Sequence, residues 1–455
     1  MKKLRIRFFG FIFLLVFCIP ASAQESKTPS VQSFSLKDAQ DYAIQHNTQM
    51  KNARLDVEIA KDRVWETTAT GLPQVNASGS YNDNLKLRTQ LLPAQFFDPN
   101  APEGEKIGVQ FGTQHNFSGD VNVSQLIFSG SYIVGLQTSR VYKSLSQKQL
   151  EKTEDDVKEL VTRTYYNILL SENNLGVLNN NLRNLQSSIR ETRAMYEEGM
   201  VEETDVDQLR ISASSLENTI GTTQQLIEVS RNQLKYQLGL ELDQSIELTD
   251  SLQDFIDQMN LEGLAETQFN PQNHIQYKIM DTQEKLAEMS VKNEKATHLP
   301  TLSGYYNYQK NAMRDEFNLF DSDKEWYTSA AIGLSLNVPI LSSGQRYMRL
   351  SQAQLKLEKT RNTKESVAES LKIAVQQARS NYEAALKKYF NQKENIKLAQ
   401  KILDRKNLEF KEGVISSMEL TQANDQYLQA QSNYTAALVE LLNARLQLDK
   451  ALNKL

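Results

Sequence analysis

"GLPQVNASGSYN" at residues 71–82 and "HLPTLSGYYNYQ" at residues 298–309 repeat one pattern in two distant parts of the chain. Each segment begins near a Leu-Pro pair and then alternates apolar with polar residues, which predicts a strand with one apolar and one polar face. Pro73 aligns with Pro300, and Tyr81 aligns with Tyr308. The two segments therefore indicate an internal repeat.

Two further pairs of segments show the same duplication. "VSQLIFSGS" at 123–131 matches "LNVPILSSG" at 336–344, and "EEGMVEETDVDQL" at 197–209 matches "KEGVISSMELTQA" at 411–423. Self-similarity of this kind indicates two copies of one supersecondary unit. Each copy is predicted to contain a helix, two strands, a very long helix, a turn and a last helix.

The duplication sets the predicted domain bounds. We predict a first repeat at residues 34–260 and a second repeat at residues 261–455. The predicted strands are, in chain order, residues 72–83, 117–129, 299–310 and 326–341. The predicted tip turns, at which the chain reverses between its long helix and its last helix, are residues 198–204 and 412–418.

Proline placement permits the long helices. The chain has no proline between Pro102 and Pro271 or after Pro339, so nothing there forces an α-helix to break. Residues 131–197 and 345–411 could each form a helix of about 100 Å.

A narrow apolar seam continues into the helix after the first tip turn. Apolar or small residues there are spaced alternately by three and four, as in a coiled coil: Val206, Leu209, Ala213, Leu216, Ile220, Thr223, Ile227, Ser230 and Leu234. An amphipathic helix bundle has a similar period. However, helices this long with one narrow seam cannot fold back into a compact globule.

Glycine and capping residues mark the two tip turns. Gly199 and Gly413 are placed to end the long helices in the left-handed conformation. Ser416 and Glu419 have the spacing of a capping box, and Thr204 is predicted to cap the last helix of the first repeat.

The tip turns also carry apolar residues, which are unusual at a solvated turn. They predict either simple helix hairpins or a docking site for a partner. The residues of this predicted docking tip are Gly199, Met200, Val201, Gly413, Val414 and Ile415.

Alternation along the strands is typical of a transmembrane β-barrel, with apolar residues outside and polar residues inside. A soluble hairpin with one buried face would alternate in the same way, but the polar segments 91–113 and 310–325 resemble the outer loops of barrels. The predicted lipid-facing residues are Val75, Tyr81, Val121, Val123, Leu302, Trp326, Ile332, Leu334, Leu336 and Val338.

Four strands are too few to form a barrel. About eight are needed to enclose packed side chains, and an open edge in lipid would leave backbone groups without partners. Either the strands lie outside a membrane, or several chains share one barrel.

The first residues have the features of an export signal. Residues 1–23 contain four basic residues, an apolar run and a small-residue cleavage site, and are predicted to be a signal peptide followed by a linker at 24–33. Cys18, the one cysteine, lies inside this signal, and Phe17 before it argues against lipidation. Removal of the signal takes the net charge from −5 to −9, which argues against a nucleic-acid partner.

The chain lacks the residues expected of an enzyme site. Its four histidines, His46, His115, His274 and His298, are scattered, and we find no phosphate-binding glycine loop and no pair of metal ligands on one helix. We predict no catalytic activity and no cofactor.

These motifs together resemble the TolC-type outer-membrane efflux ducts. The similarity covers about residues 34–455 and includes the helix start "SLKDAQDYAIQHN" at 35–47, the strand ends "QLIFSGS" and "VPILSSG", and the tips "YEEGMVEETDV" and "FKEGVISSMEL". The resemblance implies a mainly α-helical homotrimer in which each copy gives four strands to one twelve-stranded outer-membrane barrel. The helices would form a long periplasmic tunnel.

The resemblance also implies a function. The duct would passively conduct substrates from an inner-membrane pump, and a periplasmic adaptor would dock at the tips. Family members narrow at that end, where this chain offers Asp205, Gln208, Glu419 and Gln422. Ile415 stands where some relatives have a basic residue that ties the tips together. The alternative function is a periplasmic adaptor or a structural coiled-coil protein.

Overall fold

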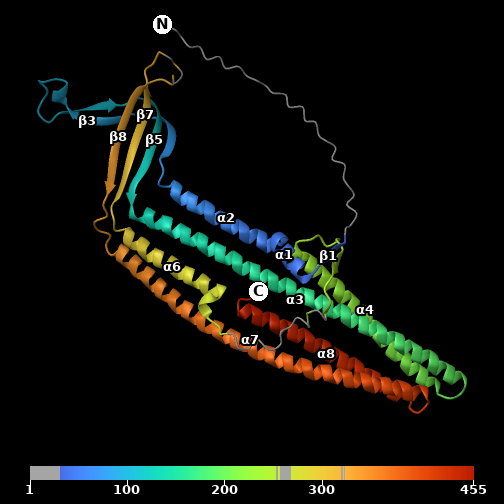
Figure 1. Cartoon of the computed structure of the whole chain (residues 1–455). Coiled ribbons are helices and arrows are strands. Elements are labelled where there is room, and N and C mark those ends of the chain that lie inside the picture. Colours follow the sequence, from blue (N-terminus) through green and yellow to red (C-terminus); the bar gives the residue numbers. More distant parts are fainter. Residues whose placement is uncertain (1–30, 253–254, 257–267, 319–320, 322) are drawn as a thin grey trace, which may run out of the picture.

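The computed structural model describes residues 31–252, 255–256, 268–318, 321 and 323–455. The predicted signal peptide and most of the predicted linker lie outside these residues. Figure 1 shows an elongated molecule with a curved sheet at one end, from which long helices run to two turns at the other end. Within the described residues, every helix is too short or too polar to cross a membrane.

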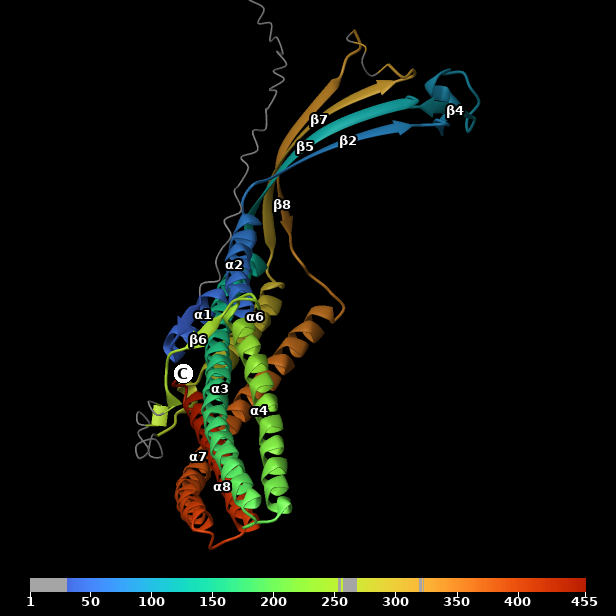
Figure 2. The ribbon, with the colours of Figure 1, turned by 90° about the vertical axis from the view of Figure 1, so that its right-hand side faces the viewer.

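Four strands form one antiparallel sheet in the order β2-β5-β7-β8 (Figure 2). Their bounds are β2 Gln74–Asp83, β5 His115–Ser129, β7 Thr301–Arg314 and β8 Tyr327–Asn337. β8 stops short of the predicted end at residue 341, because Pro339 cannot donate a ladder hydrogen bond. β2 and β8 are the edges of this sheet, and neither has a second partner strand among the described residues.

Cross-strand pairing gives the sheet two different faces. Residues that lie directly opposite each other share a face, and one face carries pairs such as Val75 with Val123 and Tyr306 with Ile332. The other face carries the row formed by Asn76, Asn122 and Asn307. The alternation predicted along single strands is therefore consistent across all four.

About half of the predicted polar loop at 91–113 is regular secondary structure. It contains β3 (Arg88–Pro93), the short helix η1 (Ala94–Phe96) and β4 (Lys106–Phe111), and β3 and β4 pair in antiparallel register. Figures 1 and 2 show this hairpin projecting away from the main sheet. The residue pattern did not predict these strands, in which Leu91 and Leu92 pair with Gly108 and Ile107.

The helices lie side by side in an order that follows the strands. Below the sheet, α2 packs on α3, α3 on α6, and α6 on α7, while α4 and α8 complete the two hairpins nearer the tips (Figure 1). Their bounds are α1 Leu36–His46, α2 Thr48–Ala69, α3 Gly130–Glu197, α4 Glu203–Leu238, α6 Ile275–Ala296, α7 Gln345–Lys411 and α8 Ser417–Ala451.

Apolar seams hold the two long hairpins together. Between α3 and α4, Leu178 packs with Leu216 and Ile220, and further toward the tip Leu185 packs with Leu209 and Ala213. Between α7 and α8, the cluster nearest the tip is Leu403, Phe410, Leu420 and Ala423. The predicted coiled-coil spacing is confirmed by these contacts.

A small parallel ribbon ties the start of the chain to the middle of the molecule. β1 (Gln32–Phe34) pairs with β6 (Ile246–Leu248), so the predicted linker at 24–33 is wrong at its last residues. The Tyr165 hydroxyl donates to the Phe34 carbonyl oxygen at 2.9 Å and also lies 3.1 Å from Asp250 Oδ2. These contacts anchor the ribbon to α3.

Candidate functional site

The polar face of the sheet is a candidate channel wall. Rows of small polar side chains cross it, and one row contains Ser78, Asp120 and Gln309. The Ser78 hydroxyl donates to Asp120, and the Ser80 and Ser118 hydroxyls lie 2.7 Å apart. A face of this composition suits a water-filled barrel interior.

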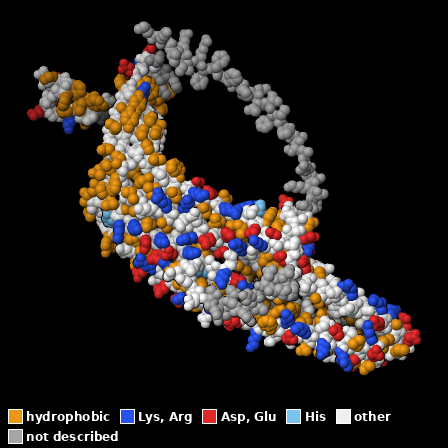
Figure 3. All heavy atoms as spheres, in the orientation of Figure 1, with side chains coloured by type: hydrophobic (Ala, Val, Ile, Leu, Met, Phe, Trp, Pro, Cys, Tyr) orange, Lys and Arg blue, Asp and Glu red, His pale blue; other side chains and the backbone are white. Residues whose placement is uncertain are grey.

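The opposite face is apolar and uncovered. Eight of the ten predicted lipid-facing residues are exposed; the exceptions, Val123 and Leu302, are half-buried. Ile332 keeps 85% of its surface exposed. Figure 3 shows hydrophobic side chains gathered over the strands, whereas charged side chains are spread over the helices. An apolar surface of this extent indicates contact with lipid or with a partner.

Both tip turns have the same hydrogen-bonded form. Gly199 and Gly413 have φ of 76° and 70°, so the predicted left-handed glycines are confirmed. The Gly199 N–H donates to the Tyr196 carbonyl, and the next N–H donates to the Met195 carbonyl. The same pair of bonds recurs after α7. Two bonds of this pattern define the Schellman motif, which ends a helix and reverses the chain.

The helices after the tips begin with different caps. Ser416 Oγ accepts the Glu419 N–H at 3.3 Å, as the capping-box spacing predicts. In the first repeat, however, the cap of α4 is Glu202 and not Thr204, since Asp205 Oδ2 accepts the Glu202 N–H at 3.1 Å. The prediction for Thr204 was wrong because α4 begins at Glu203, which places Thr204 inside the first helical turn.

The structure brings Asp205 and Glu419 to the same end of the molecule. The Ser417 hydroxyl donates to Asp205 Oδ1 and so joins α4 to α8, while Lys406 of α7 lies 3.2 Å from Glu419. Ser417 and Lys406 were missed by the sequence analysis, because nothing in the local pattern shows which helices meet there. Gln208 and Gln422 lie one turn further along α4 and α8.

The apolar tip residues differ in exposure. Met200 and Val414 are exposed over 74% and 72% of their surfaces, and Val201 is half-buried. Ile415 instead packs against the cluster that contains Phe410 and Leu420. Met200 and Val414 are therefore the tip side chains most available to a partner, whereas Ile415 stabilises its own hairpin.

The two hairpins meet through an interface with both polar and apolar residues. A groove of about 540 Å³ runs between α3, α4 and α8 and is lined partly by Asn174, Ser212, Ser215, Asn424 and Gln431. Leu178 and Leu428 are also part of the lining, and further from the tips Leu170 of α3 packs in one apolar cluster with residues of α7 and α8. The two hairpins are thus joined by mixed contacts near the tips and by an apolar cluster further from them.

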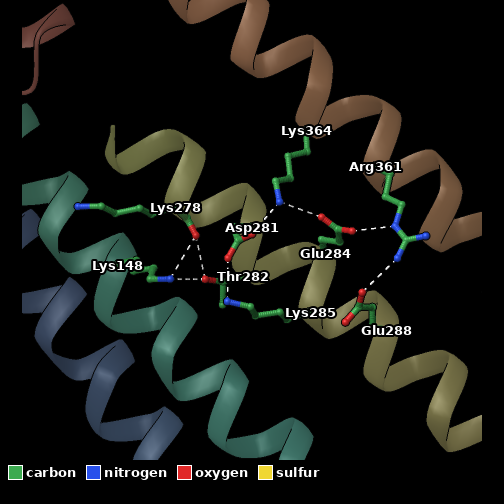
Figure 4. Close-up of polar contacts among 9 residues, drawn as sticks. All are labelled: Lys148, Lys278, Asp281, Thr282, Glu284, Lys285, Glu288, Arg361 and Lys364. Carbon is green, nitrogen blue, oxygen red and sulfur yellow. Dashed lines mark hydrogen bonds and ion pairs between the residues drawn. The ribbon is translucent and has the colours of Figure 1, made fainter. Parts of the chain in front are cut away.

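Ion pairs join α6 to α7 (Figure 4). Lys364 lies 2.7 Å from Asp281 and 3.0 Å from Glu284, and Arg361 lies 2.7 Å from Glu284 and 3.1 Å from Glu288. Burial opposes the charge on Lys364, but the hydrogen bonds to the two carboxylates outweigh it and raise its pKa. Hydrogen bonds from Lys285 and Lys364 lower the pKa of Asp281.

Lys364→Met is expected to lower the free energy of unfolding by about 1 to 2 kcal/mol, because two partly buried carboxylates lose their shared cation. The pKa of Asp281 is lowered in the folded state, so this stabilisation is present at neutral pH and is lost as the pH falls below about 4. Denaturant unfolding followed by helical circular dichroism measures both effects. The control Lys372→Met removes an exposed pair with Glu369, and an equal loss there would contradict the prediction.

Comparison with known proteins agrees with this geometry. The sequence matches the family described as outer membrane efflux protein over residues 40–240 and 278–454. The chain belongs to the outer membrane efflux protein family. It is also similar to outer membrane protein TolC of Vibrio cholerae serotype O1, with 20% identity over 450 residues that cover 96% of this chain and 94% of that protein.

Solved structures of outer-membrane channels share the fold. CusC has a TM-score of 0.70 at 18% identity, with 92% of each chain covered. VceC of Vibrio cholerae has a TM-score of 0.69 at 15% identity, with 92% of this chain and 95% of VceC covered. The fold predicted from the resemblance is confirmed, and as a member of the outer membrane efflux protein family the chain is an efflux channel component located in the outer membrane.

Proposed function

We propose that three copies of this outer membrane efflux protein form one channel, in which each copy gives four strands to a shared twelve-stranded barrel. The observation that carries this proposal is a sheet with one apolar face, one polar face and two open edges. β2 and β8 run in opposite directions, so β8 of one copy can pair with β2 of the next in antiparallel register. Such pairing gives the backbone N–H and C=O groups of both edge strands hydrogen-bond partners inside the lipid bilayer.

The helices support the same mode of assembly. α2 and α7 are the outer members of the helix layer, and each exposes large apolar side chains. These side chains are Leu55, Ile59 and Trp65 on α2 and Tyr347, Met348 and Leu355 on α7. Contact between α7 of one copy and α2 of the next would cover both groups and extend the barrel into a helical tunnel across the periplasm.

The proposed channel conducts passively and catalyses no reaction. Substrates would enter from an inner-membrane pump through a periplasmic adaptor, and they would leave through the polar barrel interior. Docking of the adaptor at the tips is supported by the exposure of Met200 and Val414.

The test of this function combines three measurements on the full chain. Extraction from membranes is expected to require detergent, native mass spectrometry is expected to give a trimer, and the purified protein is expected to conduct ions across planar bilayers. A periplasmic adaptor or a structural coiled-coil protein would conduct nothing. Release without detergent, or a monomer in detergent with no conductance, would exclude the channel.

The acidic tip is expected to favour cations at the entrance. Three copies would place Asp205 and Glu419 around the narrow end, although Lys406 offsets part of the charge on Glu419. Asp205→Asn with Glu419→Gln is expected to lower the potassium-to-chloride permeability ratio by about twofold. Reversal potentials in bilayers measure this ratio.

A matched control distinguishes the effect of charge at the entrance from the effect of charge elsewhere at the tip. Asp207→Asn removes one exposed carboxylate of α4, which pairs with Arg210. This variant is expected to keep the wild-type permeability ratio. An unchanged ratio in the double variant would remove Asp205 and Glu419 from the entrance.

A further inference from the structure

The hairpin between β2 and β5 has an apolar surface that no other element among the described residues covers. We call residues 85–111, which include β3, η1 and β4, the outer arm. The outer arm makes no extensive contact with another element among the described residues. Its exposed apolar residues are Leu85, Leu91, Phe96, Phe97, Ile107 and Phe111, and Figure 3 shows hydrophobic side chains over much of it. A patch of this kind on a surface outside lipid indicates a binding partner.

The position of the outer arm indicates which partner lies closest. The arm begins just beyond Asp83, at the outer end of the edge strand β2. In the proposed channel, on which this inference rests, β8 of the neighbouring copy lies beside β2. The first surface that the arm meets is therefore the neighbour's segment at the start of β8.

Charge complementarity supports the same contact. Lys86 and Arg88 are exposed at the base of the outer arm, and neither takes part in an ion pair among the described residues. The segment before β8 exposes Asp321, Asp323 and Glu325, which likewise have no ion pair in the described part of the chain. Opposite charges on facing surfaces fix orientation and favour the correct partner.

We propose that the outer arm of each copy packs against the neighbouring copy, beside the start of its β8. The apolar residues of the arm would be covered there, and Lys86 and Arg88 would face Asp323 and Glu325. Three such contacts around the ring fasten the outer end of the barrel. Each arm thus acts as a clasp between copies, in addition to the pairing of the strands.

Site-specific photocrosslinking tests this contact in the full chain. Phe111, which pairs with Arg88 at the base of the outer arm, is replaced by benzoylphenylalanine, and intact outer membranes are irradiated. The expected product is a covalent dimer or trimer of this chain, with the linked peptide containing residues 323–326. Products formed with lipid or with another protein would overturn the proposal. If no cross-links form in a preparation that native mass spectrometry shows to be trimeric, the proposed contact of the outer arm is wrong. The proposed trimeric channel is then unaffected.

A charge swap makes the test specific. Lys86→Glu with Arg88→Glu is expected to lower the cross-linking yield at least about threefold, and the addition of Asp323→Lys with Glu325→Lys is expected to restore it. The control adds Asp98→Lys with Glu103→Lys instead, which makes the same charge change at the far end of the arm. A restored cross-linking yield with this control would overturn the proposed contact. Failure of Asp323→Lys with Glu325→Lys to restore the yield would overturn it too.

Discussion

Leu334→Arg is expected to reduce the amount of assembled channel in the outer membrane to less than about one tenth of the wild-type level. Leu334 lies in β8 on the apolar face, with 70% of its surface exposed. An arginine on the lipid face near the middle of a membrane costs about 2 to 4 kcal/mol, and each trimer would carry three of them. A cost of about 1.4 kcal/mol already changes an equilibrium tenfold.

The neighbouring residue provides the control for this variant. Ser335 pairs with Ser303 on the polar face, so Ser335→Arg adds the same charge toward the barrel interior. This variant is expected to assemble at the wild-type level and to change only conductance. Quantitative immunoblots of unheated outer-membrane samples give the trimer yield. Equal yields for Leu334→Arg and Ser335→Arg would show that the apolar face does not contact lipid.

Tyr165→Ala is expected to lower the free energy of unfolding by about 4 kcal/mol. Tyr165 is 0% exposed and lies in the largest core cluster, between Phe34, Val161 and Leu238. Removal of a buried aromatic ring leaves a cavity and typically costs about 3 to 5 kcal/mol. The loss also leaves the Phe34 carbonyl without its hydroxyl donor, so the ribbon of β1 and β6 loses its anchor on α3.

Tyr165→Phe separates the ring from the hydroxyl. This variant keeps the packing and loses only hydrogen bonds, so the expected cost is about 1 kcal/mol. Denaturant unfolding of the detergent-solubilised protein gives both values. Hydrogen exchange is expected to be faster at β1 in both variants, and a wild-type exchange rate there in Tyr165→Ala would contradict the anchoring role.

Sequence patterns predicted the elements better than their contacts. Alternation predicted the two faces of the sheet, and Gly199 and Gly413 were correctly placed at the helix ends, since these features depend on neighbours within a few residues. The predicted cap of α4, Thr204, was wrong by two residues, because several polar residues in "EETD" can each cap a helix. The domain bounds and the roles of the tip residues stay predictions.

The candidate site was predicted only in part. The sequence placed Asp205 and Glu419 at the tips through the repeat and the family resemblance, yet it could not supply Ser417 or Lys406 as their partners. The ion pairs of Lys364 with Asp281 and Glu284 were not predicted, for the same reason. Exposed lysines and carboxylates occur throughout both helices, and only their facing positions select the pairs.

The sequence by itself determined that this protein is a duplicated chain with long seamed helices and four strands too few to close a barrel. Periodicity, glycine and proline act over short distances along the chain, so these features can be deduced without a structure. Only the tertiary structure decided the strand order β2-β5-β7-β8, the parallel pairing of β1 with β6 and the projection of the outer arm. These depend on which distant segments meet and in what register, and packing of the whole chain sets both.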